Sequence, residues 1–376
     1  MRIHPLLWIS ASTGLLSLAA CAGSNPSSAT PTPERAEVGR LLFFDASLSE
    51  PAGQSCATCH GADSHFTDPR GTLTSQGVLE GSFGSRNAPS ASYAAFSPAF
   101  HYDAEGGTYQ GGQFLDGRAS SLEEQAQGPP LNPIEMHNPD KAAYVAKVSR
   151  APYAFRLRQL GGEDLFQDPD RAFQVISEAI AAFERTPVFS PFSSKYDTYL
   201  KGAAPLTAQE RRGLDLFEGR AACSACHPNR SEDPRVPPLF TDFTYDNLGV
   251  PRNTENPFYS MPEAVNPLGR AFVDIGLAGN PQVVREGRAP ESRGKFKVPT
   301  LRNLARTAPY MHHGGFRTLK EVVSFYNRRD LEPLRFGPPE VPENVNRDEL
   351  GNLGLSDEEE DALVAFLNTL TDGYRP

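Results

Sequence analysis

Apolar side chains recur at helical spacing in several stretches of this chain, and this pattern predicts a mainly helical protein. Two of these stretches, 34–43 and 207–217, each carry an apolar face. The second begins with a capping box, because Thr207 is followed three positions later by Glu210. The same criteria predict further helices over residues 121–127, 141–160, 170–185, 318–326 and 356–369.

The segments between these helices are rich in residues that interrupt regular structure. The chain has 32 glycines and 34 prolines, and almost no segment alternates apolar and polar residues as a strand would. Long loops are therefore expected between the helices.

An internal repeat divides the chain into two halves. Two segments of the first half recur in the second with the same offset. The segment Gly39 to Phe43 corresponds to Gly213 to Phe217, and Phe66-Thr67-Asp68 corresponds to Phe240-Thr241-Asp242. Such a repeat indicates that one unit has been duplicated. We expect two domains, covering residues 36–200 and 201–376.

Each half contains a Cys-x-x-Cys-His motif, Cys56 to His60 in the first and Cys223 to His227 in the second. Two thiols at this spacing can form thioethers to the two vinyl groups of one porphyrin, and the adjacent histidine can bind the iron. A lone Cys-x-x-Cys would also suit a redox dithiol or half of a zinc site. No second Cys-x-x-Cys lies close to either motif, so the sequence predicts two covalent c-type haems in cytochrome-c-like domains. The haem contacts are Cys56, Cys59, His60, Cys223, Cys226 and His227.

The fifth cysteine, Cys21, lies at the end of an apolar N-terminal stretch. Arg2, this stretch and the sequence Leu18-Ala19-Ala20-Cys21 have the layout of a lipoprotein signal peptide over residues 1–20, although an ordinary secretory signal with a free Cys21 is the alternative. The stretch is too short and too rich in serine for a membrane span. We expect lipidation at Cys21, a flexible tether over 21–35, and a periplasmic protein anchored to the outer membrane.

The formal net charge of −10 argues against binding to nucleic acid or to an anionic membrane surface. It would suit a basic electron donor, although solubility alone would account for it equally well.

Taken in order, the motifs resemble those of the bacterial di-haem cytochrome c peroxidases and their MauG-type relatives. Besides the two haem motifs, the matching segments are Arg86-Asn87-Ala88-Pro89, Gln113 to Ala119, Leu122 to Ala126, Asn132-Pro133-Ile134-Glu135-Met136, Val298 to Asn303 and Pro309 to Gly314. The resemblance implies that the N-terminal haem reduces hydrogen peroxide to water. It also implies that the C-terminal haem receives electrons from a small soluble cytochrome c or cupredoxin, and that the protein forms a homodimer.

The resemblance also implies roles for individual residues. Peroxide cleavage needs a free axial position on iron and a nearby group that moves a proton. Glu124 is the expected proton shuttle and Gln113 the residue that positions the oxygen, with Glu123 as the alternative to Glu124. Asn87, Thr307 and Pro309 match the positions that hold a calcium ion, which prefers oxygen ligands.

The chain departs from the peroxidase branch at the haem ligands. The segment 74–79, which carries a distal histidine in that branch, has none, and Val78 stands in its place. The iron of the first haem is therefore expected to have a free axial position at rest. If a second ligand does occupy that position, His65 and His101 are the first candidates. Tyr326 stands where a methionine ligand is usual, as in the MauG branch, with Met261 and Met311 as alternatives.

The inter-haem tryptophan of the family is also absent, because the only tryptophan is Trp8. Tyr102 is the expected substitute as an electron relay.

Three functions follow from these patterns. The first is a cytochrome c peroxidase. The second is a MauG-like enzyme that uses peroxide to oxidise side chains of a partner protein. The third is an electron carrier with both irons closed, which the expected open site and Glu124 disfavour.

Overall fold

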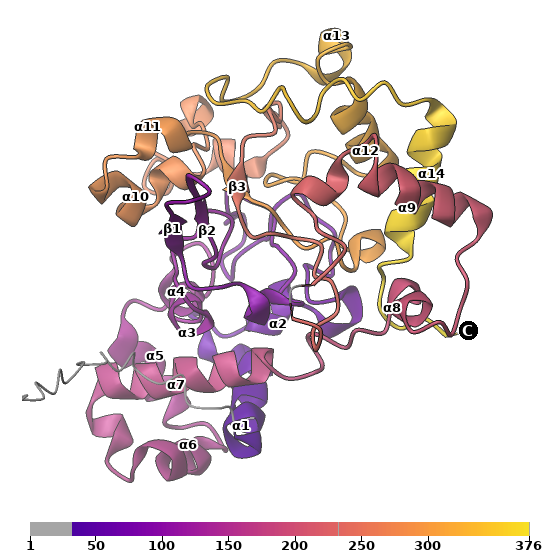
Figure 1. The fold of residues 1–376 in the computed structure, drawn as a ribbon. Helices are drawn as coiled ribbons and strands as arrows, with labels where there is room; N and C mark the ends of the chain where they lie inside the picture. Colours follow the sequence, from indigo (N-terminus) through magenta and orange to yellow (C-terminus); the bar gives the residue numbers. More distant parts are fainter. Residues whose placement is uncertain (1–31, 232, 376) are drawn as a thin grey trace, which may run out of the picture. The chain divides into compact units, whose positions relative to one another are not determined.

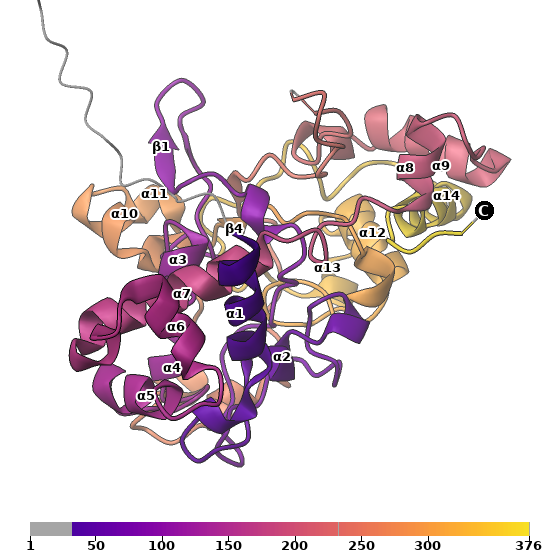
Figure 2. The same ribbon diagram turned by 90° about the horizontal axis from the view of Figure 1, so that it is seen from below.

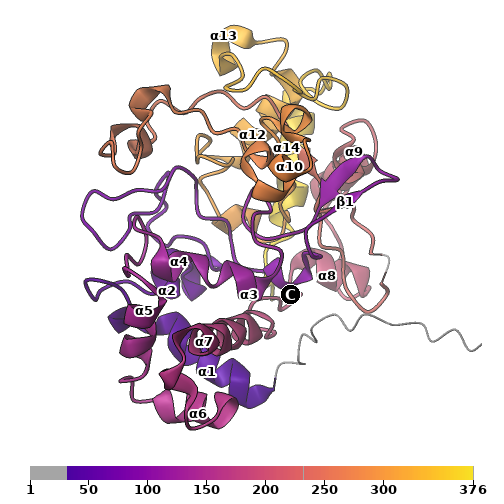
Figure 3. The ribbon, with the colours of Figure 1, turned by 90° about the vertical axis from the view of Figure 1, so that its left-hand side faces the viewer.

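The computed structural model describes residues 32–231 and 233–375 of the chain. Its first half is organised around two packed helices, α1 (Pro33–Phe44) and α7 (Pro169–Glu184). They lie side by side (Figure 1 and Figure 3), and Gly39 allows their close approach, since a Cβ there would lie 1.8 Å from the carbonyl oxygen of Ala179. Apolar side chains from both helices, such as Leu42 and Phe173, form the core of this half.

The second half repeats this arrangement with α9 (Ala208–Glu218) and α14 (Asp357–Asn368). A Cβ at Gly213 would lie 2.0 Å from the carbonyl oxygen of Ala362, so glycine is required at the same place of the repeat. Helix α12 (Leu319–Arg328) packs against α14, and Figure 2 shows α9 and α14 together near the C-terminus. The two halves therefore use the same helix pair, each with its own apolar core.

Shorter elements connect these pairs. The remaining helices are α2 (Cys56–Cys59), α3 (Leu122–Gln125), α4 (Gly128–Leu131), α5 (Lys141–Val148), α6 (Ala154–Gly161), α8 (Lys195–Leu200), α10 (Pro281–Arg285), α11 (Ala289–Ser292) and α13 (Pro333–Phe336). Single turns of 3₁₀ helix cover Ala46–Leu48, Ala62–Ser64, Ala94–Phe96, Leu165–Gln167, Cys223–Ala225, Pro257–Ser260, Gly269–Ala271, Leu277–Gly279 and Leu304–Arg306.

Two small antiparallel sheets complete the described part of the chain. Strand β1 (His101–Asp103) pairs with β2 (Thr108–Gln110), and β3 (Tyr245–Asp246) pairs with β4 (Phe296–Lys297). The prediction of a mainly helical protein with long loops is confirmed.

Most predicted helices are present, with differences that have physical reasons. The single helix expected over 141–160 is wrong, because the chain forms α5 and α6 there with a break that contains Pro152. Proline lacks the N–H for a helical hydrogen bond and disfavours helical geometry in the preceding residue. The helix expected over 121–127 is shorter than predicted, since α3 ends at Gln125.

The expected tether over 21–35 is wrong at its C-terminal end. Thr32 caps α1 by accepting a hydrogen bond from the backbone N–H of Arg35, and Pro33 occupies the first turn, where it is well tolerated. Residues 33–35 are therefore helical. The expected signal peptide and the expected lipidation site, Cys21, lie outside the described residues.

A buried ion pair joins segments that are far apart in the sequence. Arg302 donates to both carboxylate oxygens of Asp197 at 2.8 and 3.0 Å, and the Arg302 side chain is fully buried. The charge is therefore paired, as buried charges must be. Within the described residues, no helix combines the length and apolar character needed to cross a membrane.

Candidate haem sites

The first Cys-x-x-Cys-His motif lies on α2 and the residue that follows it. Ser55 and Thr58 form a capping box at the start of this helix. His60 lies with its Nδ1 2.9 Å from the carbonyl oxygen of Phe66, which fixes Nδ1 as the donor and leaves Nε2 free to bind a metal. Burial lowers the pKa of His60, so the ring is held in the neutral form that ligates iron.

The second motif is built in the same way. Nδ1 of His227 lies 2.8 Å from the carbonyl oxygen of Phe240, and burial lowers the pKa of His227 to about 4. Phe66 and Phe240 occupy the same place in the repeat, and both have a positive φ, 57° and 55°. The repeated Phe-Thr-Asp sequence therefore has a structural role, which is to turn a backbone carbonyl toward the histidine of each motif.

The environment of the four cysteines suits uncharged sulfur. Burial raises the pKa of Cys56, Cys223 and Cys226 to about 12, and it also raises the pKa of Cys59. Reactive or metal-binding cysteines have lowered pKa values, because those roles use the thiolate. Thioethers carry no charge, so these sites fit covalent attachment of haem.

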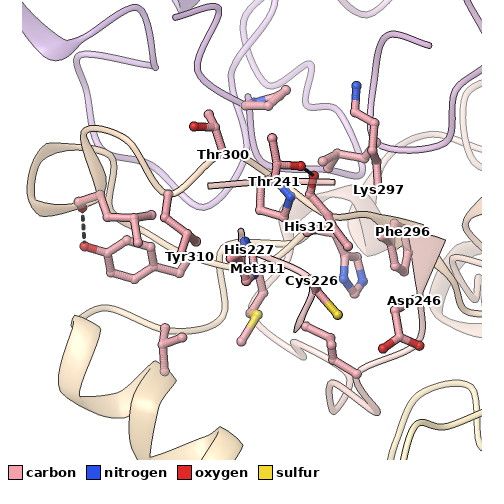
Figure 4. A pocket seen from close by; sticks show the side chains of 18 of the residues that line it. Cys226, His227, Thr241, Asp246, Phe296, Lys297, Thr300, Tyr310, Met311 and His312 are labelled. Carbon is pink, nitrogen blue, oxygen red and sulfur yellow. Dashed lines mark hydrogen bonds between the residues drawn. The ribbon is translucent and has the colours of Figure 1, made fainter. Parts of the chain in front are cut away.

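A cavity of about 370 Å³ adjoins the second motif. Figure 4 shows Cys226, His227, Met311 and His312 among the side chains that line it. Apolar side chains of the second half form much of the rest of the wall, namely Phe217, Leu319, Val323, Leu363 and Leu367. A large apolar group attached to Cys223 and Cys226 would be surrounded by these side chains.

The same cavity also has polar groups that fit the carboxylates of a haem. The buried Nε2 of His312 has no hydrogen-bond partner in the described part of the chain, and the His312 ring stacks on Phe296 with centroids 3.9 Å apart. Lys297 donates to the carbonyl oxygen of Gly112 at 2.5 Å, and burial lowers its pKa to about 8. A buried ammonium favours an anionic partner, and the unpaired Nε2 of His312 can donate a hydrogen bond to one. The residues present therefore fit a c-type haem.

Tyr326, the expected sixth ligand of the C-terminal haem, lies on α12 and lines the cavity together with His227. Burial raises its pKa, and the nearby Cys223 adds to the shift, so the phenol is neutral unless a cation lies beside it. Met311 also lines this cavity. The sulfur of Met261 instead accepts a hydrogen bond from the N–H of Phe83 at 3.4 Å and is not part of the lining.

The two residues expected to act on peroxide have different surroundings. Glu124 is exposed, and its carboxylate accepts a hydrogen bond from the N–H of Ser120 at 2.7 Å. Gln113 is buried, donates to the carbonyl oxygen of Ala94 at 3.1 Å, and lines the cavity of the second motif. The alternative, Glu123, forms a bidentate ion pair with Arg185 at 2.6 and 3.0 Å.

Glu135 is a carboxylate near the first motif for which no role was expected. Burial raises the pKa of Glu135, and Oε1 accepts a hydrogen bond from the side chain of Asn132 at 2.7 Å. The charge of Glu135 raises the pKa of the Cys56 thiol, which indicates that the two groups lie near each other. Its carbonyl oxygen accepts a hydrogen bond from the N–H of Val78 at 2.9 Å, so Glu135 lies against the 74–79 segment. Its place in the Asn-Pro-Ile-Glu-Met motif was the available signal.

A second carboxyl also acts on the first motif. Glu184, the last residue of α7, is 7% exposed, and burial raises its pKa to about 8. After burial, the charge of Glu184 is the next largest cause of the raised pKa of the Cys56 thiol. Nothing in the sequence distinguished Glu184 from the exposed acids of the other helices.

The three residues expected to hold calcium all line the cavity. The side chain of Asn87 donates to the carbonyl oxygen of Leu73 at 3.1 Å, which turns its amide nitrogen away from a cation and leaves the carbonyl oxygen as the possible ligand. Thr307 and Pro309 flank Ala308, whose peptide bond to Pro309 is cis. The described residues contain no group of three or more His, Cys, Asp or Glu side chains that could hold a metal. A calcium site here would therefore depend on neutral oxygens.

The remaining expected residues lie outside the cavity. Tyr102 is on β1, where the guanidinium carbon of Arg288 lies 3.8 Å from its ring centroid. His101 is exposed, and its Nδ1 lies 2.9 Å from the carbonyl oxygen of Ala99. His65 is half-buried with a left-handed φ of 52°, and its carbonyl oxygen accepts hydrogen bonds from Ser90 and Ser92.

Comparison with known proteins agrees with this arrangement. Residues 33–205 match the model of the di-haem cytochrome c peroxidase family. The chain is 43% identical over 358 residues to the methylamine utilization protein MauG of Paracoccus denitrificans, which covers 91% of this chain and 89% of that protein. It is 32% identical to the cytochrome c551 peroxidase of Nitrosomonas europaea, over 90% of this chain and 81% of that protein. The crystal structure of the di-haem peroxidase BthA of Burkholderia thailandensis aligns with a TM-score of 0.82 at 36% identity, over 91% and 87% of the two chains.

Proposed function

Because the chain belongs to the di-haem cytochrome c peroxidase family, with two c-type haems, we propose that it reduces hydrogen peroxide to water with electrons from a small periplasmic donor protein. The observation that carries this proposal is the matched pair of motif histidines, each with Nδ1 against a backbone carbonyl at 2.9 and 2.8 Å. Both histidines are oriented for iron in the same way, which supports one haem in each half.

Haem, when bound, supplies iron that can bind peroxide and exchange single electrons. The protein must then move protons, because cleavage of the O–O bond to give water needs a proton on the leaving oxygen. A carboxylate does this best when its pKa lies near the working pH, so that it can both accept and return a proton.

Among the candidate acids, Glu135 is better suited to this role than Glu124. Burial raises the pKa of Glu135, and Glu135 lies against the 74–79 segment and near Cys56. Glu124 is exposed and caps the turn at Ser120. We therefore assign to Glu135 the transfer of the proton within hydrogen peroxide. Asn132 holds its carboxylate in place.

Tyr326 is the proposed sixth ligand of the haem in the second half. It lines the cavity together with His227, and burial raises the pKa of its phenol, so a phenolate would form there only beside a cation such as the iron. An anionic oxygen ligand would favour the oxidised form of the iron. Electrons would enter the protein at this half.

Further parts of the proposal concern the setting of the enzyme. Lipidation of Cys21 would anchor it to the outer membrane on the periplasmic side, and a calcium ion at Asn87, Thr307 and Pro309 would lie between the halves. The net charge of −10 would attract a basic cytochrome c or cupredoxin. The active form is proposed to be a homodimer.

The 43% identity to MauG supports a second candidate, an enzyme that uses peroxide to oxidise side chains of a partner protein. Steady-state consumption of hydrogen peroxide with reduced cytochrome c tests the first function against this alternative. Oxidation of two cytochrome molecules per peroxide is the result expected of a peroxidase. Peroxide that reacts with the haems without oxidising any small donor would favour the alternative.

A further inference from the structure

Tyr93 has a position in the structure that the catalytic scheme does not use. It is 2% exposed and lines the cavity of the second motif. Its hydroxyl donates to Oδ2 of Asp372 at 2.7 Å and accepts a hydrogen bond from the N–H of Phe192 at 3.1 Å. Its φ of 63° lies in the left-handed region, which is strained for tyrosine and is maintained only when the surroundings fix it.

Tyr93 is also linked by contacts to the first motif. Its N–H donates to the carbonyl oxygen of Phe189 at 3.0 Å. The ring of Phe189 stacks on Phe66 with centroids 3.9 Å apart, and the carbonyl of Phe66 orients His60. Tyr93 therefore touches the wall of the second haem site and is one packed residue away from the segment that holds the first histidine.

The partner of its hydroxyl distinguishes Tyr93 from the other tyrosines that line the cavity, Tyr310 and Tyr326. Tyr310 donates to the carbonyl oxygen of Leu304, which cannot take up the proton at neutral pH. Tyr326 is the proposed iron ligand. Only Tyr93 of these three donates to a carboxylate, so it alone can lose an electron and its phenolic proton together.

The charges around Tyr93 favour this coupling. The guanidinium carbon of Arg302 lies 5.0 Å from the centroid of the ring, and a positively charged oxidised ring would be repelled by it. Transfer of the proton to Asp372 removes that repulsion. Asp372 is half-buried and also accepts from the N–H of Ser193 at 2.8 Å, so it is held in place but reaches solvent.

From this geometry we propose that Tyr93 and Asp372 form a proton-coupled electron relay between the two haem sites. Tyr93 gives one electron to the peroxide-oxidised first site, and its phenolic proton passes to Oδ2 of Asp372. One electron from the second site and the same proton then restore the phenol. Each cycle moves one electron: the phenolic O–H bond breaks as an O–H bond forms at Oδ2 of Asp372, and the return step reverses both changes. The inference rests on the proposed peroxidase function.

The test uses the protein with both haems bound and the second haem reduced. On mixing with hydrogen peroxide, Tyr93→Phe should slow oxidation of the second haem, followed by absorbance, by about tenfold or more. Tyr109→Phe is the matched control, because Tyr109 is also buried and donates to a carboxylate, Glu286, but lies outside the cavity. It should change the rate by less than about twofold. Rapidly frozen wild-type protein treated with peroxide should show a tyrosyl radical by electron paramagnetic resonance, and Tyr93→Phe should lack it.

An unchanged rate in Tyr93→Phe overturns the relay. A slower rate without a tyrosyl radical in the wild type, or with one that persists in Tyr93→Phe, also overturns it, because Tyr93 would then only position its neighbours. Wild-type protein that fails to consume peroxide would instead reject the proposed function. That failure is separate from a relay failure, in which the wild type turns over normally.

Discussion

At the residue scale, Glu135 and Glu124 are distinguished by their surroundings. Glu135→Gln keeps the size and the contact with Asn132 but removes the base, so peroxide consumption should fall by about 100-fold or more with both haems still attached. Glu124→Gln is the control, and it should change the rate by less than about threefold, since it alters an exposed side chain. A large loss in the Glu124 variant together with normal turnover in the Glu135 variant would restore the assignment made from the sequence.

Tyr326 allows a spectroscopic prediction. If its oxygen binds the second haem iron, Tyr326→Phe should convert a low-spin ferric haem to high spin, which electron paramagnetic resonance and absorption spectra detect. Loss of a hydroxyl that is only packed would cost about 1 kcal/mol of stability and leave the haem spectrum unchanged. In that case Met311→Leu should be examined, because Met311 also lines the cavity.

Glu184 should make the stability of the protein depend on pH. Its pKa is raised from 4.5 to about 8, so the folded protein holds this proton more tightly than the unfolded chain does. The stabilisation is fully present below pH 4.5 and is lost as the pH rises toward 8. Denaturant unfolding should show the free energy of unfolding of Glu184→Gln rising by about 2–4 kcal/mol relative to that of the wild type as the pH increases over this range. The same change at the exposed Glu163 should show no such trend, and parallel curves for wild type and Glu184→Gln would contradict the prediction.

At the element scale, the paired helices depend on two glycines. Gly39→Ala or Gly213→Ala would place a methyl group within 2.0 Å of a backbone oxygen on the facing helix, so α1 and α7, or α9 and α14, must move apart. Overpacking of this kind should cost about 3 kcal/mol in the free energy of unfolding. Gly279→Ala is the control, because its nearest neighbour would lie at 3.9 Å. Equal stability of all three variants would show that the helix pairs adjust freely.

The elements also show what the sequence could and could not predict. Capping signals such as Thr207 with Glu210 locate helix starts, because they satisfy backbone groups locally. Pro152 marks the end of a helix in the sequence, but the apolar periodicity continues across it and led to the expectation of one helix over 141–160. The β1 hairpin forms where no strand was expected, since its pairing depends on packing of Tyr109 against Phe100 from the rest of the fold.

The candidate sites also contain residues that local sequence signals identify and residues that only contacts between distant segments reveal. The motif cysteines and histidines could be identified because their spacing is itself the chemical requirement. The roles that we propose for Glu135 and Tyr93 could not be predicted, because the burial of these residues, the contact of Glu135 with Val78 and the contact of Tyr93 with Asp372 arise between distant segments. Glu124 was expected from the motif resemblance, and ranking it against a carboxylate in a neighbouring motif needs the burial of each, which depends on the fold.

At the scale of the whole molecule, the duplication predicts that the two halves bind haem separately. The histidine of each motif donates to a backbone carbonyl of its own half, that of Phe66 or that of Phe240. Each half also has its own apolar core. Replacing Cys223 and Cys226 with serine should therefore remove one haem and leave the other attached to Cys56 and Cys59. Intact mass spectrometry of the purified protein should show two haems in the wild type and one in the variant.

The variant also separates the roles of the two halves. With the second haem absent, peroxide should still react at the first site, and reduced cytochrome c should no longer be oxidised at an appreciable rate. A matched variant at Cys56 and Cys59 should lose the reaction with peroxide while the second haem stays reducible. A variant at Cys223 and Cys226 that carries no haem at all would show that attachment in one half depends on the other, and the halves would then have to be treated as a single haem-binding unit.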